Sequence, residues 1–413
     1  MANTFNTCRF CDNRLERIFV DLGMSPLANS FLRAEVLQQM EPHYPLCVYV
    51  CEACYLIQLP VYQTPEEIFG DYAYFSSYSD SWLKHAKNYA DLIVERFRFD
   101  SNSQVIEIAS NDGYLLQYFK VKGIPVLGVE PAENVAKVAN EVGIPTLVDF
   151  FGTEMAMRLV ADGKRADLLI GNNVLAHVPN LNDFVRGMKI ILKENGVVTM
   201  EFPHLMRLID ENQFDTIYHE HFSYFSFLTV EKVFAKHGLT LFDVEELPTH
   251  GGSLRIYARH HDDNSKPVSK RVLEMKDQEN AAGFGKMEHY LSFGQKVKET
   301  KCNILGFLIK AKQEGKSIAG YGAPAKGNTL LNYCGIRTDF IEYTVDRSPH
   351  KQGQYLPGTH IPIYHPDKIK ETRPDYLVIL PWNLKEEIME QMAYVREWKC
   401  KFVVLIPEVK VYD

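Results

Sequence analysis

The segment that is most informative about the fold is Val105-Ile106-Glu107-Ile108-Ala109-Ser110-Asn111-Asp112-Gly113. Its first four residues form a short apolar run typical of a buried strand. The next five form a tight turn, and a helix-like stretch begins at Tyr114. A strand, a turn and a helix in this order are typical of an α/β unit, in which ligands bind beyond the carboxyl ends of the strands.

The same alternation continues towards the C-terminus. The sequence predicts strands at Pro125–Val129, Pro145–Val148, Ala166–Gly171 and Val197–Phe202, helices ending at Val142 and spanning Thr229–His237, and two β-like stretches at Leu239–Glu246 and Ser253–Arg259. Strands separated by helices imply right-handed crossovers and therefore a parallel sheet.

A second α/β unit is predicted from Ser317 onwards. Its elements are a strand at Ile318–Tyr321, a glycine-rich turn and helix at Gly322–Cys334, and strands at Phe340–Val345, Tyr376–Leu380 and Phe402–Ile406. The charged residues 262–300 have a loose helical period, so we expect helices or a helical linker there.

Two C-x-x-C pairs, Cys8–Cys11 and Cys51–Cys54, flank a segment with little regular pattern. Four thiolates in two such pairs can close a tetrahedral Zn²⁺ site, which replaces a core in a small module. Because four cysteines leave no open position for water, we expect structural zinc. The segment between the pairs is long enough to carry a subdomain. Cys47 is nearby but lacks a C-x-x-C partner.

Length and composition exclude several classes of protein. A chain of 413 residues predicts two or three domains, and 46% hydrophobic with 24% charged residues is a globular composition. The net charge of −8 argues against a nucleic-acid partner. The N-terminal residues do not resemble a signal peptide, and no apolar run reaches the roughly 18 residues of a membrane span. We therefore expect a cytoplasmic protein.

The segment Tyr218–Ser226 places four groups that can hold or move protons side by side: Tyr218, His219, Glu220 and His221. A base, a phenol and an orienting carboxylate are what proton abstraction next to a carbonyl requires. The same residues could also form a packed loop with satisfied polar groups. The segment alone leaves both interpretations open.

A second glycine-rich turn, Gly320–Asn328, fits the pattern G-x-G-x-x-A after a strand, with Asp346 downstream. Alone it indicates NAD binding. Pro324 and Lys326 are less usual in that motif, and a lysine with backbone amides at a helix N-terminus also suits a substrate phosphate. A plain turn is the third alternative.

Together these features resemble the nucleotide-sugar C-methyltransferases that act on 4-keto-6-deoxy sugars. The likeness covers nearly the whole chain and rests on the two cysteine pairs and on seven segments in the family's order: Asp71–Ser79, Glu107–Gly113, Asn172–Val178, Glu201–His204, Tyr218–Ser226, His250–Arg255 and Gly320–Asn328.

The resemblance implies an α/β fold of three domains. These are an N-terminal zinc module (residues 1–75), a central Rossmann-like seven-stranded methyltransferase domain (76–262), and a helical linker with a C-terminal Rossmann-like domain that holds the sugar nucleotide (263–413). It implies S-adenosylmethionine as cofactor and a keto sugar linked to dTDP or GDP as substrate. We expect a monomer.

For the cofactor, Glu130 is placed to bind two ribose hydroxyls, and Asp149 with Phe150 to bind and cover an adenine. Ala109 departs from the family's usual first glycine. The expected cofactor contacts are Glu107, Ala109, Ser110, Asn111, Gly113, Glu130, Asp149, Phe150 and Asn172.

For catalysis, a ketone at C4 makes the C3 proton acidic enough for a positioned base to remove. We expect His221 to be that base and Glu220 to orient it. The expected donors to the enolate oxygen are Tyr218, His177 and Tyr72. The expected substrate contacts are Tyr74, His204, Lys326, Asn328 and Arg347.

Structural roles remain open for several of these residues: a loop cap for His177, an ion pair for Glu220 and packing for the tyrosines. Two rival functions also remain. One is an NAD-dependent nucleotide-sugar oxidoreductase or epimerase, and the other is a zinc-containing scaffold with a degenerate methyltransferase fold. Affinity for S-adenosylmethionine, for NAD or for neither distinguishes the three functions.

Overall fold

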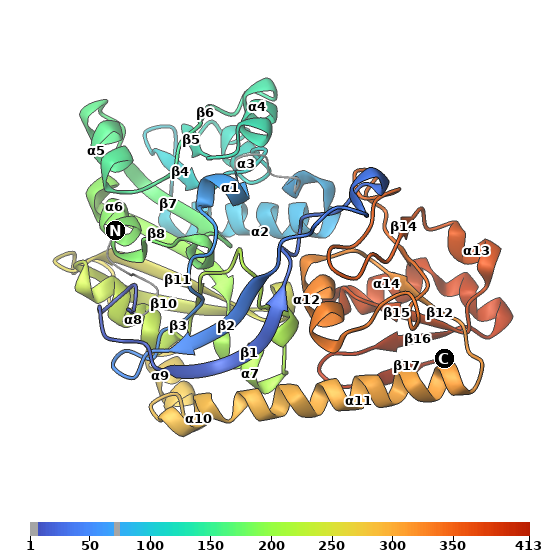
Figure 1. The fold of residues 1–413 in the computed structure, drawn as a ribbon. Coiled ribbons are helices and arrows are strands. Elements are labelled where there is room, and N and C mark those ends of the chain that lie inside the picture. Colours follow the sequence, from blue (N-terminus) through green and yellow to red (C-terminus); the bar gives the residue numbers. More distant parts are fainter. Residues whose placement is uncertain (1–6, 70–74) are drawn as a thin grey trace. The chain divides into compact units, whose positions relative to one another are not determined.

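The computed structural model describes residues 7–69 and 75–413 and divides into two compact units, whose elements are labelled in Figure 1. The first unit comprises residues 1–15, 51–204 and 222–285, and the second comprises residues 16–50, 205–221 and 286–413. No helix of the described residues is both long and apolar enough to cross a membrane.

The first unit is built on a seven-stranded sheet of order β10-β11-β8-β7-β4-β5-β6. Its strands are β4 (Val105–Ile108), β5 (Val126–Val129), β6 (Thr146–Leu147), β7 (Ala166–Asn172), β8 (Leu192–Pro203), β10 (Leu239–Leu247) and β11 (Ser253–His260). Strands β4 to β8 pair in parallel, and β10 and β11 add an antiparallel edge. The predicted α/β sheet is confirmed.

Helices of the first unit connect and cover these strands. They are α1 (Pro65–Phe69), α2 (Asp80–Phe97), α3 (Leu116–Lys120), α4 (Glu133–Glu141), α5 (Thr153–Ala161), α6 (Leu181–Ile191), α8 (Phe227–Lys236) and α9 (Lys270–Ala282). Helix α2 begins at an N-cap, where the Ser79 side chain accepts a hydrogen bond from the Trp82 amide. Its Tyr89 and Ile93 pack with Phe119 of α3 and Leu168 of β7 in one core cluster. Two short strands, β3 (Ile57–Gln58) and β9 (Ser223–Tyr224), pair antiparallel.

The second unit contains a six-stranded sheet of order β14-β13-β12-β15-β16-β17. Its strands are β12 (Ile318–Tyr321), β13 (Thr344–Val345), β14 (Ile363–Tyr364), β15 (Tyr376–Ile379), β16 (Lys401–Val404) and β17 (Lys410–Tyr412). In chain order this is 3-2-1-4-5-6, with β17 antiparallel, so the predicted Rossmann-like C-terminal unit is confirmed.

The helices of the second unit are α7 (Leu205–Asp210), α10 (Met287–Leu291), α11 (Phe293–Gln313), α12 (Ala325–Cys334), α13 (Lys368–Thr372) and α14 (Lys385–Gln391). The long helix α11 ends shortly before β12, and α11 and α12 both contact β1 (Figure 1). The helices predicted within residues 262–300 are confirmed as α9, α10 and the start of α11.

Two sequence expectations were wrong. The segment between the cysteine pairs is regular: β1 (Arg17–Ser25) and β2 (Tyr44–Val50) pair antiparallel. The strand predicted at Phe340–Val345 is reduced to Thr344–Val345, because the amides of Phe340 and Ile341 both bond to the carbonyl of Arg337 and close a turn.

Candidate active site and metal centre

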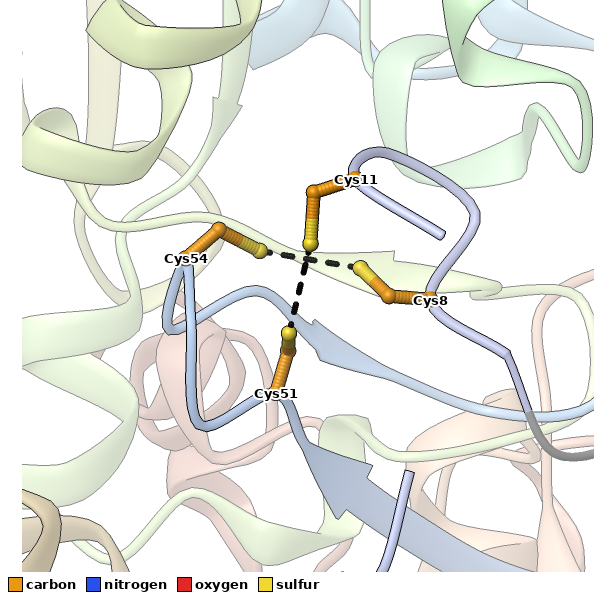
Figure 2. A group of neighbouring side chains, drawn as sticks. All are labelled: Cys8, Cys11, Cys51 and Cys54. Atoms are coloured by element: carbon orange, nitrogen blue, oxygen red, sulfur yellow. Dashed lines mark hydrogen bonds between the residues drawn. The ribbon is translucent and has the colours of Figure 1, made fainter. Parts of the chain in front are cut away.

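The two cysteine pairs converge on one point, as Figure 2 shows. The sulfur of Cys8 lies 3.6 Å from that of Cys54, the sulfur of Cys11 lies 3.5 Å from that of Cys51, and all four lie within 4.8 Å of one another. Tetrahedral Zn–S bonds of about 2.3 Å place neighbouring sulfurs roughly 3.8 Å apart. The four side chains therefore fit a zinc ion and leave no position for water.

The backbone forms the same type of turn at both cysteine pairs, and this turn orients the sulfur atoms. The residue after each pair, Asp12 or Tyr55, has a positive φ (62° and 66°). The amide of Asp12 bonds to the Cys8 carbonyl and that of Tyr55 to the Cys51 carbonyl, each at 2.9 Å. Cys47 lies outside this cluster, on β2.

The turn after β4 is held in a strained conformation. Ala109, Asn111 and Gly113 have φ values of 54°, 50° and 80°. Only glycine adopts this left-handed region without cost, and such strain is concentrated at ligand sites. Ala109 thus occupies a conformation that would suit the family's glycine. Gly128 on β5 leaves room for this turn, because a Cβ there would lie 2.3 Å from Ser110 Oγ.

Glu130, at the end of β5, orients this turn. Its carboxylate accepts hydrogen bonds from the amides of Asn111 and Ala132, each at 2.9 Å. Burial raises the pKa of Glu130, and these two amides oppose the shift.

Glu107 is fully buried on β4, and no described residue donates a hydrogen bond of normal geometry to either carboxylate oxygen. Burial, reinforced by the charge of Glu130, raises its pKa well above the usual range, although the nearby Tyr114 phenol opposes the shift. Ser110 Oγ and Asp112 Oδ1 are also buried and have no hydrogen-bond partner among the described residues. Unsatisfied polar atoms around a strained turn require a partner, and the hydroxyls and amino group of S-adenosylmethionine are of the right kind.

The remaining expected cofactor residues lie at the carboxyl ends of neighbouring strands. Asp149 and Phe150 follow β6; Asp149 is paired with Arg158, and the Phe150 ring is 37% exposed. Asn172 ends β7, and its Nδ2 lies 3.5 Å from the Tyr114 phenol.

Ser76 and Ser77 bind the same turn through their backbone amides. The amide of Ser76 donates to Asn111 Oδ1 at 2.9 Å, and that of Ser77 donates to Asp112 Oδ2 at 3.1 Å. Both bonds come from backbone amides, so they tie the end of the Asp71–Ser79 motif to the turn after β4. Tyr72 and Tyr74 lie outside the described residues.

The base proposed from the sequence, His221, lies in the second unit and is 9% exposed. Its Nδ1 lies 2.8 Å from the Thr216 carbonyl, so this nitrogen carries the proton of the neutral ring and the lone pair is on Nε2. The Tyr218 ring lies 4.0 Å from the imidazole, centroid to centroid. The structure therefore brings together the imidazole and the phenol expected from the sequence.

Glu220 has a different partner from the one expected. Its carboxylate accepts a hydrogen bond of 2.6 Å from Asn29, while Thr216 orients His221. Burial raises the pKa of Glu220 to about 7, although Asn29 and Lys351 oppose the shift. His219 is buried, with Nε2 3.3 Å from the Pro45 carbonyl, and burial lowers its pKa to about 4.

Two other expected site histidines lie in the first unit. His177 ends a 3-10 turn after β7 and is partly exposed. His204 is 1% exposed, and its Nε2 lies 2.7 Å from Glu279. The same carboxylate accepts bonds from the first two amides of α8, so His204 belongs to a buried helix cap.

Two other family motifs meet at the carboxyl end of β8. The Glu201 carboxylate accepts hydrogen bonds from His85, Arg255 and Thr249. Burial would raise the pKa of Glu201, but His85 and Arg255 outweigh it and lower the pKa to about 2. Sequence reasoning missed His85, which lies on α2, 116 positions from its partner.

The second glycine-rich turn is closed by its own chain. The Ala323 amide donates to Asp346 at 2.8 Å, and the Ala323 carbonyl accepts from Lys351 at 2.8 Å. A Cβ at Gly322 would lie 2.6 Å from Pro381. In a dinucleotide site the acid binds a ribose and the glycine admits the pyrophosphate. Here Asp346 is bonded to the Ala323 amide and Pro381 fills the space next to Gly322, which argues against NAD binding.

Two of the expected diphosphate contacts, Lys326 and Asn328, lie on α12, and the third, Arg347, follows β13. Lys326 donates to Asn383 and Asn328 donates to the Ala28 carbonyl, so both have partners within the chain. Arg347 is exposed and lines a cavity of about 500 Å³ together with Tyr321, His365, Lys370 and Gln391.

Family models match three successive parts of the chain. Residues 8–69 match a zinc binding domain, residues 82–244 a methyltransferase domain and residues 248–407 a C-methyltransferase C-terminal domain. The C-methyltransferase NovU of Streptomyces niveus is 35% identical over 411 residues, which cover 100% of this chain and 98% of that protein.

Solved structures resemble a smaller part of the chain. The PH0226 protein from Pyrococcus horikoshii OT3 covers 48% of this chain and 99% of its own, at 16% identity and a TM-score of 0.36. An S-adenosylmethionine-dependent methyltransferase from Anabaena variabilis covers 41% of this chain and 82% of its own, at 15% identity and a TM-score of 0.34.

Proposed function

Because the chain belongs to the S-adenosylmethionine-dependent C-methyltransferase family, we propose that it methylates C3 of a nucleotide-linked 4-keto-6-deoxy sugar through an enolate. The observation that carries the proposal is the imidazole of His221, whose Nδ1 proton is fixed on the Thr216 carbonyl and which packs against the Tyr218 ring. Membership of a C-methyltransferase family favours methylation at carbon over methylation of a hydroxyl.

In the first step the C3–H bond breaks. The proton passes to His221 Nε2, and its electron pair forms the C3–C4 double bond while negative charge develops on the C4 oxygen. Tyr218 donates a hydrogen bond to this oxygen, and His177 and Tyr72 are further candidates for that role. The lone pair on His221 Nε2 accepts the proton, and the imidazolium can later release it to water.

In the second step a bond would form between C3 and the methyl carbon while the methyl–sulfur bond breaks, its electron pair stays on sulfur as a neutral thioether, and the ketone at C4 re-forms. S-Adenosylmethionine, when bound, supplies the electrophilic methyl group. Glu130 holds its ribose, the turn from Ala109 to Gly113 meets its methionine part, and Asp149 with Phe150 contacts its adenine. The zinc ion on the four cysteines has a structural role.

The nucleotide half of the substrate belongs, in this proposal, to the cavity beside β12. Its lining offers the Arg347 guanidinium for a phosphate and the Tyr321 ring for a base. The carboxyl ends of the strands in a Rossmann-like sheet are the usual place for such a ligand. We assign dTDP or GDP as the nucleotide class.

The test is exchange of the C3 proton in D2O without a methyl donor, with dTDP- and GDP-linked 4-keto-6-deoxy sugars as probes and NMR as readout. We expect the native enzyme to exchange C3–H and to add one methyl carbon at C3 when S-adenosylmethionine is present. His221→Asn keeps a donor for the Thr216 carbonyl but removes the base, so exchange falls at least about a hundredfold.

The matched control is His219→Gln, whose amide can replace the Nε2 donor to Pro45 and which should exchange normally. Exchange at the native rate in His221→Asn would remove His221 from the role of base. Methylation of none of the probes would overturn the substrate class.

A further inference from the structure

The helix that follows the second glycine-rich turn contacts the segment that carries His221. Thr329 Oγ of α12 donates a hydrogen bond of 3.0 Å to the carbonyl of Ile217. The residue before it, Asn328, donates to the Ala28 carbonyl at 2.6 Å, next to Asn29, the partner of Glu220. Two neighbouring residues of α12 therefore hold the backbone at Ile217, four positions before the proposed base, and at Ala28.

Lys326, at the start of α12, acts on the same segment through charge. Its ammonium lies 4.5 Å from the centre of the Trp382 ring and donates to Asn383 at 2.8 Å. The indole N–H of Trp382 donates to Asp215 at 2.7 Å. Asp215 immediately precedes Thr216, whose carbonyl holds His221.

Both charges are costly to bury. Burial raises the pKa of Asp215 to about 6 and the charge of Lys326 opposes this, while burial lowers the pKa of Lys326 and Asp215 opposes that shift. Asp215 is fully buried. The cost of removing such charges from water offsets most of the attraction between them, so their most useful effect is to select one arrangement of the groups around them.

The glycine-rich turn itself acts on Glu220, at the C-terminal end of the segment from Asp215 to His221. Its Ala323 carbonyl holds Lys351, whose charge acts on Glu220. Glu220 is the residue immediately before His221. The glycine-rich turn and α12 thus bear on Asp215, Ile217 and Glu220, all within six positions of the base.

We propose that Lys326 and Thr329 are positioning residues for proton abstraction. They fix the segment from Asp215 to His221 so that the imidazole keeps its bond to Thr216. This inference rests on the proposed function, and it replaces the expectation that Lys326 contacts the diphosphate. In this proposal the glycine-rich turn helps to position the segment that carries His221 and does not bind the diphosphate.

The first test separates positioning from phosphate binding. Lys326→Met should lower kcat and the rate of C3 exchange about tenfold and leave the KM for the sugar nucleotide nearly unchanged, because misplacement of a base slows the chemical step. A lost phosphate contact would raise KM at constant kcat. Arg347→Met, which we assign to phosphate binding, provides that comparison.

The second test asks whether Lys326 acts through Asp215. Asp215→Asn can keep the Trp382 bond while it removes the charge. Lys326→Met and Asp215→Asn should each slow exchange about tenfold, and the double variant should be no slower than either single one. Thr329→Val should also slow exchange, and Thr329→Ser, which keeps the hydroxyl, should restore it.

Thermal unfolding of each variant identifies any that fail to fold. If Lys326→Met and Asp215→Asn do not fold, the comparison of Thr329→Val with Thr329→Ser still tests the inference. Raised KM with native kcat in Lys326→Met, or native exchange in both Lys326→Met and Thr329→Val, would overturn the inference. His221→Asn is measured alongside: if it alone abolishes exchange, the proposed function stands while the positioning role falls.

Discussion

The Nδ1 atom of His221 lies 2.8 Å from the carbonyl oxygen of Thr216, five positions earlier in the chain. A carbonyl can only accept, so the bond selects the neutral tautomer with its lone pair on Nε2. A backbone group does this more reliably than a carboxylate, because it does not titrate. The proposed base is thus oriented by a neutral group.

This bond predicts different stabilities for two variants of His221. Asn retains a donor for the Thr216 carbonyl, whereas Ala leaves that buried acceptor unpaired and opens a space beside Tyr218. We expect His221→Ala to lower the free energy of unfolding by about 1–3 kcal/mol and His221→Asn to cost clearly less. Urea unfolding monitored by circular dichroism measures both, and equal losses would contradict the assigned bond.

Glu220 predicts a pH dependence of stability. Its pKa is raised to about 7 in the folded chain from an ordinary value of 4.5, mainly by burial. The folded state therefore binds this proton more tightly than the unfolded state. Its contribution to the free energy of unfolding is complete below pH 4.5, falls as pH rises to about 7, and changes by on the order of 3 kcal/mol.

The measurement is urea unfolding of the native protein and of Glu220→Gln at pH 5 and pH 7.5. Asp215 titrates in the same window and in the same direction. The difference between the two proteins isolates Glu220. The variant should lose less stability over this range, whereas the exposed control Glu397→Gln should behave like the native protein. If Glu220→Gln shows the same pH dependence as the native protein, the pKa of Glu220 is not raised in the folded state.

Much of the fold could be predicted because its strands are short apolar runs. Val105–Ile108 is buried at every position, so it contrasts sharply with the polar turn after it. Strand β1 could not be found in this way, because register shifts at Ile18/Val20 and Asp21/Met24 break its alternation. Strand β2 could have been found, since Leu46, Val48 and Val50 alternate as a half-buried strand requires.

The candidate site was predictable only where its groups are adjacent in sequence. Tyr218 and His221 share one segment and were expected to serve the same reaction, and the structure shows their rings in contact. The partner of Glu220 is Asn29, 191 positions away, and nothing in either residue indicates the other. Thr216 contributes a backbone carbonyl, which has no side-chain signal. The pattern of Gly320–Asn328 predicted a ligand, yet Lys351 and Asp346 bind that turn from within the chain.

Replacing Glu130 and replacing Glu107 should have different effects on cofactor binding: the first should weaken it and the second should leave it nearly unchanged. Glu130 is assigned to the ribose and accepts two amides of the cofactor turn, so Glu130→Gln should weaken S-adenosylmethionine binding about ten- to a hundredfold. Burial raises the pKa of Glu107 well above its usual range and so favours the neutral carboxyl, and the neutral isostere Glu107→Gln should bind within about threefold of the native protein. Isothermal titration calorimetry measures both. Native affinity in Glu130→Gln, or a large loss in Glu107→Gln, would reverse these assignments.

Zinc should contribute to the free energy of unfolding, because the Cys8–Cys11 pair and the Cys51–Cys54 pair come from distant parts of the sequence and no disulfide joins them. Cys51→Ser should abolish stoichiometric zinc and lower the free energy of unfolding by several kcal/mol. Cys47→Ser is the matched control, since Cys47 lies on β2 opposite Asp21 and outside the cluster. Elemental analysis of dialysed protein with thermal unfolding tests both. A Cys51→Ser protein that still holds one zinc per chain at native stability would exclude the four-sulfur site.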